Sequence, residues 1–435
     1  MANTASTAHP GTSPPTEITA TVNRIQTWRV AATGMVALGV AMGIGRFAFT
    51  PLLPMMLADG VVTLPEAGWL ASMNYLGYLV GALLCMLQPR IGRRLGRTMP
   101  PNGPTWVCYG LLATVVLTLG MAVHAPAAWP LLRFAAGVAS AVVFVYTSGW
   151  CLTELARLNR PTMGALIYVG PGAGIVISGL AASGMVALHG TAWTGWLIFG
   201  VLAATLTCTV WPTLRTGGKR HSAATAAPML SGTSGSSGGK SSEIGLLTYA
   251  YGLAGFGYII TATFLPVIAR QALPGSPWLD LFWPLFGVGV VVGALGASRI
   301  RGVRDLRLLL IGCYLVQAAG ITTSVVSPSL LGFALGSFLL GLPFTAITYF
   351  AMQEVRRLRP AHAASYIGLA TAIYGAGQIA GPPLVALLVA RSLTPGAGFN
   401  LSLTVAACAL VLGALVYGCM VGRYPVTKAP NRRSE

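Results

Sequence analysis

The feature that most constrains this chain is a series of apolar runs of about twenty residues, each long enough to cross a hydrocarbon core of ~30 Å as a helix. Charged residues make up only 8% of the chain, whereas a soluble domain carries about 25%. In lipid, a helix satisfies its own backbone hydrogen bonds. The runs therefore predict an all-α membrane protein with twelve transmembrane helices, at residues 30–54, 66–88, 105–124, 128–152, 162–186, 192–212, 246–269, 278–298, 306–326, 329–352, 363–389 and 398–421.

The basic residues predict the orientation of these helices, because Lys and Arg accumulate in short cytoplasmic loops. With both termini inside, twenty-three of the twenty-seven basic residues fall on the cytoplasmic side. Arg270 and Arg391 fall in outside loops, and Arg46 and Arg133 fall within predicted helices. We expect a multi-pass protein of the bacterial inner membrane with both termini cytoplasmic. The net charge of +18 is then a topology signal, and nucleic-acid binding is not expected.

The longest polar interruption divides the chain into two halves. Residues 213–243 contain a run of Ser, Gly and Thr, which predicts a flexible cytoplasmic linker. This linker separates an N-terminal six-helix bundle at 29–212 from a C-terminal six-helix bundle at 244–422. Residues 1–28 are predicted to be a disordered cytoplasmic tail without a secretory signal, and residues 423–435 a second cytoplasmic tail.

The two halves repeat in the same orientation. An offset of 212 residues superposes the first two helices of each half at glycines and a proline: Gly43 on Gly255, Gly45 on Gly257, Pro54 on Pro266, Gly77 on Gly289 and Gly81 on Gly293. A parallel repeat is typical of carriers whose halves rock about a site near the membrane midplane.

The loop after the second helix resembles the signature of the major facilitator superfamily, a Gly-rich run that ends in Asp-Arg-x-Gly-Arg-Arg. The matching residues are Arg90, Gly92, Arg93 and Arg94. Pro89 replaces the aspartate, so the charge latch that the resemblance implies lacks its usual acid. Glu154 and Glu354, at the inner ends of helices four and ten, are the expected replacement partners. Alternatively, these arginines only fix the topology, because exposed ion pairs are weak.

Two further motifs resemble the same superfamily. Arg133, four residues before Gly137, resembles its helix-four motif, although an arginine near the helix end also snorkels readily to the interface. In helix five, Gly170 and Pro171 resemble a kink motif associated with antiporters, and a purely structural kink explains them equally well.

The string from Gly43 to Pro54, with Ala67 to Tyr78 in the second helix, closely resembles the YbfB/YjiJ-type branch of the superfamily. The resemblance extends over all twelve helices. It implies the major facilitator fold, with two pseudo-symmetric six-helix bundles, and a transport role without naming a substrate.

Arg46 is the candidate centre of the binding site. An arginine at the centre of a membrane helix costs roughly 2.5–3.5 kcal/mol on insertion scales, so it is expected to face a bundle interior. All nine acidic residues lie in tails, loops or helix ends. The site thus favours an anion, whose carboxylate fits the guanidinium fork. The other candidate substrate-binding residues are Asn74, Tyr78, Tyr146, Tyr168, Tyr258, Trp283, Tyr349, Tyr374 and Gln378.

Together these features predict a secondary carrier that moves a small organic anion, with a monocarboxylate or amphipathic acid favoured, by alternating access. The residues leave open proton cotransport, uniport and exchange, because neither histidine nor acid lies within a span. A proton-coupled drug or metabolite exporter is the alternative. A membrane sensor or enzyme is less favoured, since no catalytic motif appears. We expect a monomer without cofactor or metal, whose seven cysteines are small buried hydrophobes.

Overall fold

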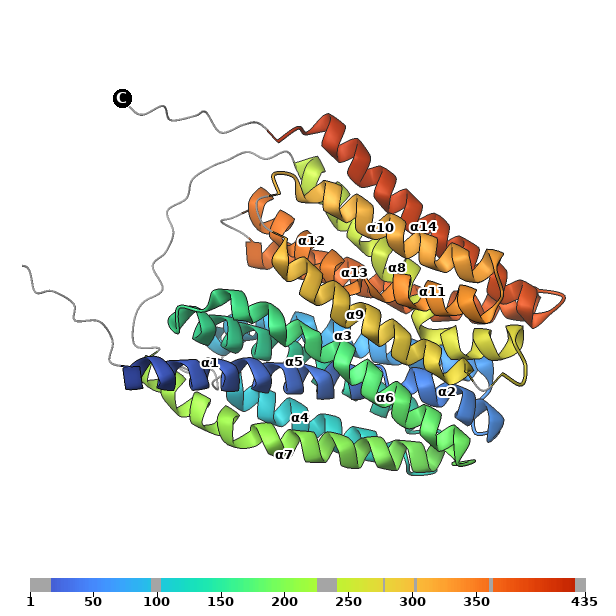
Figure 1. Cartoon of the computed structure of the whole chain (residues 1–435), viewed down its shortest axis with the longest axis horizontal. Helices are drawn as coiled ribbons and strands as arrows, with labels where there is room; N and C mark the ends of the chain where they lie inside the picture. The colour runs from blue at the N-terminus through green and yellow to red at the C-terminus, as the bar shows by residue number, and fades with distance from the viewer. Residues whose placement is uncertain are drawn as a thin grey trace, which may run out of the picture.

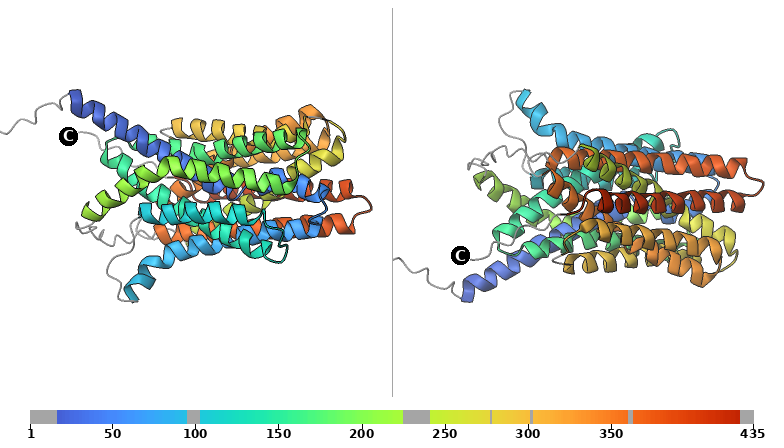
Figure 2. Two further views of the ribbon diagram at one scale, coloured as in Figure 1. Left: turned by 90° about the horizontal axis from the view of Figure 1, so that it is seen from below. Right: turned by 90° about the horizontal axis from the view of Figure 1, so that it is seen from above.

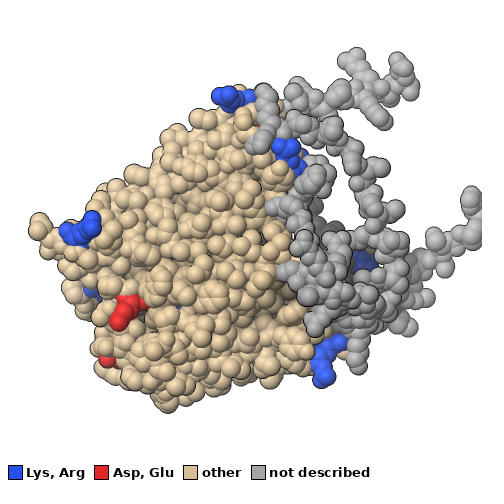
Figure 3. Space-filling view, turned by 180° about the vertical axis from the view of Figure 1, so that it is seen from behind, with Lys and Arg blue, Asp and Glu red and all other residues tan. Residues whose placement is uncertain are grey.

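The computed structural model describes residues 17–94, 103–224, 241–276, 278–300, 303–359 and 363–426. Within these ranges the secondary structure is entirely helical, and twelve helical segments are long and apolar enough to span a membrane. The predicted all-α class and the number of spans are therefore confirmed. On the face shown in Figure 3, charged side chains lie near the ends of the helices and the wide surface between them is uncharged.

The N-terminal half, coloured blue to green in Figure 1, carries the first six spans. Its elements are α1 (Glu17–Leu38), the π-helix η1 (Gly39–Ile44), α2 (Phe49–Ala58), α3 (Leu64–Arg94), α4 (Gly103–Gly120), α5 (Trp129–Arg157), the 3-10 helix η2 (Pro161–Tyr168), α6 (Val169–Ala187) and α7 (Ala192–Ala224).

The C-terminal half, coloured yellow to red, lies beside the first half and carries the other six spans. Its elements are α8 (Ser241–Ala272), the 3-10 helix η3 (Leu279–Leu281), α9 (Phe282–Arg299), α10 (Leu306–Val326), α11 (Leu330–Gly341), α12 (Phe344–Leu358), α13 (Ala363–Arg391) and α14 (Pro395–Arg423).

We call the end of the bundle where α1 begins and α14 ends the terminal end, and the opposite end the distal end. The halves meet mainly where α3 packs on α13 and α6 packs on α9. At the distal side α2 also packs on α8, whereas α1 makes no comparable contact with α8. Figure 1 shows the halves diverging toward the terminal end, and in both views of Figure 2 the terminal ends of α1 and α3 lie on opposite sides of the bundle.

The internal repeat explains how the two halves pack. A Cβ atom added to Gly77 would overlap the carbonyl oxygen of Phe134, and one added to Gly289 would overlap that of Phe338. Both repeated glycines therefore allow equivalent close helix contacts, α3 on α5 and α9 on α11. The hydroxyl of Thr50 donates a hydrogen bond of 3.2 Å to the carbonyl of Ala262, its equivalent at an offset of 212.

Parts of the predicted tail and linker are helical in the structure. Residues 17–28 belong to α1, so the N-terminal tail is helical there, and residues 1–16 lie outside the described ranges. Within the linker predicted at residues 213–243, α7 continues to Ala224 and α8 begins at Ser241. Residues 225–240 and 427–435 lie outside the described ranges.

The cysteines are less buried than predicted. Cys108 and Cys151 are buried, but Cys208, Cys408 and Cys419 are exposed on helices that span the membrane. Small side chains of this kind are also tolerated where a helix faces lipid, and polarity alone does not distinguish the two faces.

Candidate functional site

The helical span predicted over residues 30–54 is confirmed within Arg24–Ala58, with a local break in the regular α-helix at its centre. After α1 the backbone forms the π-helix η1, in which the N–H of Gly45 bonds the carbonyl of Val40 at 2.9 Å. Residues 45–48 form turns before α2 begins. Pro51 has no N–H to donate to Phe47, so a regular helix cannot continue unchanged through the segment. Arg46 lies in this break.

Arg133 of α5 holds the broken segment. Its Nη1 and Nη2 atoms donate to the carbonyl oxygens of Gly45 and Arg46 at 3.4 and 3.2 Å. Its guanidinium carbon lies 4.9 Å from the ring centroid of Phe49. Only 2% of Arg133 is exposed, so the side chain does not snorkel to the interface. Arg133 therefore stabilises the backbone that carries Arg46.

The side chain of Arg46 crosses from the N-terminal half to the C-terminal half. Arg46 is 3% exposed, and its Nη2 donates to Oε1 of Gln378 on α13 at 2.6 Å. The amide nitrogen of Gln378 in turn donates to the hydroxyl of Tyr258 on α8. Gln378 and Tyr258 are both about 1% exposed. The three side chains form a buried hydrogen-bonded chain between the halves.

Aromatic rings surround the Arg46 guanidinium. Its central carbon lies 4.1 Å from the ring centroid of Tyr78 and 5.3 Å from that of Tyr75. Farther out, Tyr374 stacks on Tyr258 with ring centroids 5.9 Å apart. Cation–π attraction partly stabilises a buried guanidinium in such surroundings. We call Arg46, Tyr75, Tyr78, Tyr258, Tyr374 and Gln378 the central cluster.

No acidic group of the described residues pairs with the central cluster. Elsewhere in the described residues, ion pairs lie at the ends of helices. One example is the pair between Arg270 and Asp280 at the distal end, which are 2.5 Å apart. The guanidinium of Arg46 is therefore a positive charge held by neutral acceptors and aromatic rings.

The two predicted gate acids pair within their own halves. Glu154 accepts hydrogen bonds from Arg157 at 2.6 Å and from Gln26 at 3.2 Å. Glu354 is fully buried and pairs with Arg357 at 2.5 Å and with Arg307 at 3.7 Å. Arg90, Arg93 and Arg94 lie at the terminal end of α3, and their side chains are outside the described part of the structure. Their pairing with the two acids stays a prediction.

Arg307 organises a cluster of charges at the terminal end of the C-terminal half. It is fully buried and binds both carboxylate oxygens of Asp305 at 2.9 Å. It also donates to Glu243 at 3.1 Å and to the carbonyl of Tyr424 at 2.8 Å. Burial would raise the pKa of Asp305, but hydrogen bonds from the Arg307 side chain and backbone outweigh burial and lower that pKa.

Several predicted binding residues do not join the central cluster. Asn74 faces α5, where its amide donates to the Arg133 carbonyl at 2.9 Å, so it joins two helices of its own half. Tyr146 bonds Gln88 and stacks on Trp106, both in its own half. The other three lie farther from the cluster. Tyr168 packs against Phe144, and Tyr349 is 40% exposed beside Phe350. Trp283 packs against Phe47 and Phe286, which lie between it and the cluster.

Further aromatic residues at the site were not predicted from the sequence, and Phe47 is one of them, with its ring centroid 5.4 Å from the Arg46 guanidinium carbon. Tyr75 packs near Arg46 and shares a hydrogen bond of 2.9 Å with Thr263 of the other half. Phe344 lies 4.9 Å from Tyr258, and Tyr251 stacks on Tyr374 at 4.6 Å between ring centroids. The available signal for Tyr75 was its position three residues before Tyr78, on the same helical face.

Gly170 and Pro171 mark a junction rather than a kink within one helix. The predicted fifth helix begins as the 3-10 helix η2 and becomes α6 at Val169, just before these residues. A Cβ atom at Gly170 would overlap the carbonyl oxygen of Met35. This glycine therefore permits the close packing of α6 on the first span.

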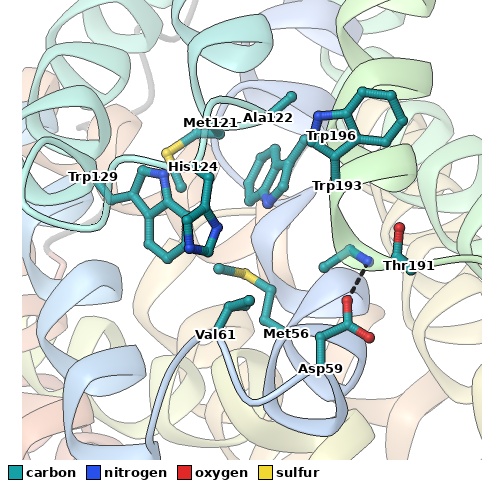
Figure 4. Close-up of a pocket in the computed structure, with 11 residues that line it drawn as sticks. Met56, Asp59, Val61, Met121, Ala122, His124, Trp129, Thr191, Trp193 and Trp196 are labelled. Carbon is teal, nitrogen blue, oxygen red and sulfur yellow. Dashed lines mark hydrogen bonds between the residues drawn. The ribbon is translucent and has the colours of Figure 1, made fainter.

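Two surface hollows lie at the distal end, away from the central cluster. One, of about 410 Å³, is formed by the N-terminal half and is shown in Figure 4. Its carboxylate, Asp59, accepts a hydrogen bond of 2.7 Å from the backbone N–H of Ala192, which caps α7. The other hollow, of about 590 Å³, surrounds Arg270 and Asp280. In each hollow the charged side chains are already engaged: Asp59 with the backbone of Ala192, and Arg270 with Asp280.

Twelve spans in two repeated six-helix halves, with a buried polar cluster between the halves, define a membrane transporter of the major facilitator type. The fold is similar to a crystal structure of a mutant of the nucleoside transporter NupG, with a TM-score of 0.65 over 90% of this chain and 99% of that chain. The sequence identity is 14%, so this likeness concerns the fold alone.

The family described as "Uncharacterised MFS-type transporter YbfB" matches residues 38–418, and the chain belongs to this family. Over 149 residues the chain is 34% identical to "Uncharacterized MFS-type transporter YceJ" of Bacillus subtilis (strain 168). That match covers 34% of this chain and 33% of the relative, about a third of its length. The family resemblance seen in the sequence is confirmed, and the family is described as one of MFS-type transporters.

Proposed function

We propose that this protein moves a small organic monocarboxylate with an apolar or aromatic body across the bacterial inner membrane by alternating access. The observation that carries the proposal is Arg46, a buried guanidinium without an acidic partner among the described residues. A buried charge is stable only when it is paired and hydrogen-bonded. A substrate carboxylate supplies both, through two parallel hydrogen bonds to the guanidinium fork.

The surroundings of Arg46 support one negative charge on the substrate. Arg133 is the other buried cation nearby, and its two terminal nitrogens are engaged by backbone carbonyls. A second carboxylate would then be buried without a partner, at a cost of several kcal/mol. The rings of Tyr78, Tyr75 and Tyr374 favour an apolar or aromatic body. Hydroxyl groups of the same residues accommodate a polar substituent.

The orientation follows from the distribution of basic residues. We propose that the terminal end faces the cytoplasm, because the arginines of α5, α12 and α14 lie in the last turns of these helices at that end. The protein then works as a monomer in the lipid bilayer, with the substrate site between its halves. Since no acidic side chain pairs with the site, a coupled proton would enter with the substrate itself.

Binding to purified protein tests this proposal. We expect benzoate and phenylacetate to raise the apparent melting temperature, because a ligand at 100 times its Kd stabilises a folded state by about 2.7 kcal/mol. Little or no shift is expected with three other ligands. Succinate carries two negative charges, choline carries a positive charge, and uridine carries no charge. Uridine is included because the structural neighbour is a nucleoside transporter, and it tests whether this chain binds a nucleoside.

Two arginine variants separate the site from general charge effects. Arg46→Ala should abolish the shift by benzoate, whereas Arg391→Ala should keep it, because Arg391 is exposed at the distal end of α13. Counterflow of labelled benzoate in liposomes should follow the same order. An equal benzoate shift in the Arg46→Ala variant, or a response to choline alone, would contradict the proposal.

A further inference from the structure

The hydrogen bond between Arg46 and Gln378 joins two helices of opposite halves at the buried centre of the protein. We infer that Gln378 holds the position on Arg46 that the substrate carboxylate takes, so that substrate binding releases a contact between the halves. Gln378 would thus be both an internal competitor for the anion and a latch. This inference rests on the proposed function, because it takes the substrate to be a carboxylate.

The Gln378 side-chain oxygen occupies the place on Arg46 that we assign to a substrate carboxylate oxygen. The distance from Nη2 of Arg46 to Oε1 is 2.6 Å, shorter than the usual 2.9–3.0 Å of an N–H···O bond and close to the values of charge-assisted bonds. Guanidinium groups only donate hydrogen bonds, so the amide oxygen must face Arg46. The amide nitrogen then faces Tyr258, which accepts its hydrogen bond and fixes the orientation.

Arg46 retains capacity for a better acceptor. Its side chain has five N–H donors, and in the described structure Gln378 accepts from one nitrogen while Nε is buried without a hydrogen-bond partner. A carboxylate has two oxygens that match the guanidinium fork, and it adds the attraction between opposite charges that a neutral amide lacks. Substrate should therefore displace the neutral amide from Arg46.

Displacement would loosen the contact between the halves. The other hydrogen bonds between the described parts of the two halves lie toward the distal end: Thr50 with Ala262, Ser72 with Ile379, Tyr75 with Thr263 and Ser183 with Asp280. Arg46 and Gln378 form the cross-half bond in which a charged group takes part. Its loss upon binding would favour separation of α13 from the broken first span, as rocking of the halves requires.

The latch is tested first without ligand, by a double-mutant cycle for thermal stability of the full-length protein. Arg46→Met and Gln378→Leu each remove one partner of the bond. If the bond joins the halves, Gln378→Leu should lower the melting temperature of the wild type but have little further effect in the Arg46→Met background. Additive effects of the two substitutions would overturn the latch.

The competitor role is tested with benzoate as the probe in calorimetry. Removal of the competing amide by Gln378→Leu should tighten benzoate binding by about 2- to 10-fold, the range of a single net hydrogen bond. Gln378→Glu tethers a carboxylate beside Arg46 and should weaken binding at least about tenfold. Unchanged or weaker binding in the leucine variant, or unchanged binding in the glutamate variant, would overturn the role.

Gln317→Leu provides the matched control. Gln317 is 1% exposed, like Gln378, but its amide donates to the carbonyl of Leu340 within the C-terminal half. The same substitution there should leave benzoate affinity unchanged. If the wild-type protein binds neither benzoate nor phenylacetate, the proposed function fails, whereas the ligand-free cycle still decides whether Arg46 and Gln378 form a latch.

Discussion

Replacement of Arg133 by methionine should impair substrate binding far more than stability. The substitution removes hydrogen bonds of 3.2 and 3.4 Å to the broken first span and the contact with the Phe49 ring. Hydrogen bonds between membrane helices average about 0.6 kcal/mol each, and a cation–π contact adds about 0.5–2 kcal/mol. The total loss is then roughly 2–3 kcal/mol.

An opposing term of similar size makes the net stability change small. Removal of a guanidinium that lies beside the middle of the first span relieves a burial cost, which is roughly 2.5–3.5 kcal/mol on insertion scales for an arginine at the centre of a membrane helix. Methionine is unbranched and fills most of the same space. The two terms nearly cancel, so we expect the free energy of unfolding to change by about 1 kcal/mol or less. The position of Arg46, however, depends on the backbone that Arg133 holds.

Benzoate calorimetry and thermal unfolding in one detergent separate the two effects. We expect benzoate affinity to fall about tenfold or more, which corresponds to about 1.4 kcal/mol, with little change in melting temperature. Arg133→Lys should have an intermediate effect, because an ammonium group lacks the fork that reaches both carbonyls. Leu131→Met, 67% exposed on the same helix, is the control. Benzoate affinity within about twofold of the wild type in Arg133→Met, against the expected ~10-fold loss, would refute the reasoning.

Two further predictions concern packing and charge. Gly77→Ala should destabilise the protein by about 1–3 kcal/mol in thermal unfolding, because the added Cβ atom would overlap the Phe134 carbonyl. Gly184→Ala is the control and should be neutral or slightly stabilising, because no atom lies within 4 Å of the Cβ atom added there. Because the folded-state pKa of Asp305 is lowered, its stabilising contribution is present above the unfolded pKa of about 3.9 and is lost as pH falls through the lower folded value. The melting temperature of Asp305→Asn should therefore change less than that of the wild type across this range, and a parallel decline would contradict the prediction.

The twelve spans were predicted from hydropathy, and the two similar halves from the internal repeat. Both signals depend only on residue type and spacing, which the sequence contains. The spans followed from length, and the 212-residue offset correctly related the first and seventh spans, as the Thr50 contact with Ala262 illustrates. The break in the first span was not predicted, although Pro51 is one sequence signal for it, because the π-helix and turns also contact the Arg133 side chain from another helix. A continuous apolar run gives no signal of such a contact.

Which residues lie at the site depends on how each helix is rotated about its own axis. The sequence did not determine this rotation. Asn74 and Tyr75 are adjacent, but successive residues of a helix point about 100° apart. Asn74 therefore faces α5 of its own half, whereas Tyr75 faces Thr263 across the interface. Buried helices are apolar on several faces, so periodicity does not identify which face meets the other half. Gln378 was recognised because an amide at lipid depth is rare on any face.

Under the proposed function, the repeat and the break give the two halves different tasks. The first and seventh spans share glycines and a proline, yet α8 continues unbroken from Ser241 to Ala272 while its counterpart is interrupted around Arg46. The interruption is therefore not a consequence of the shared pattern. Where Arg46 stands in the first half, Tyr258 stands in the second. If the substrate is the proposed anion, it would bind the N-terminal half by charge and the C-terminal half by neutral hydrogen bonds and ring contacts. In the proposed alternating-access cycle, the weaker contact with the C-terminal half would then be the first to separate.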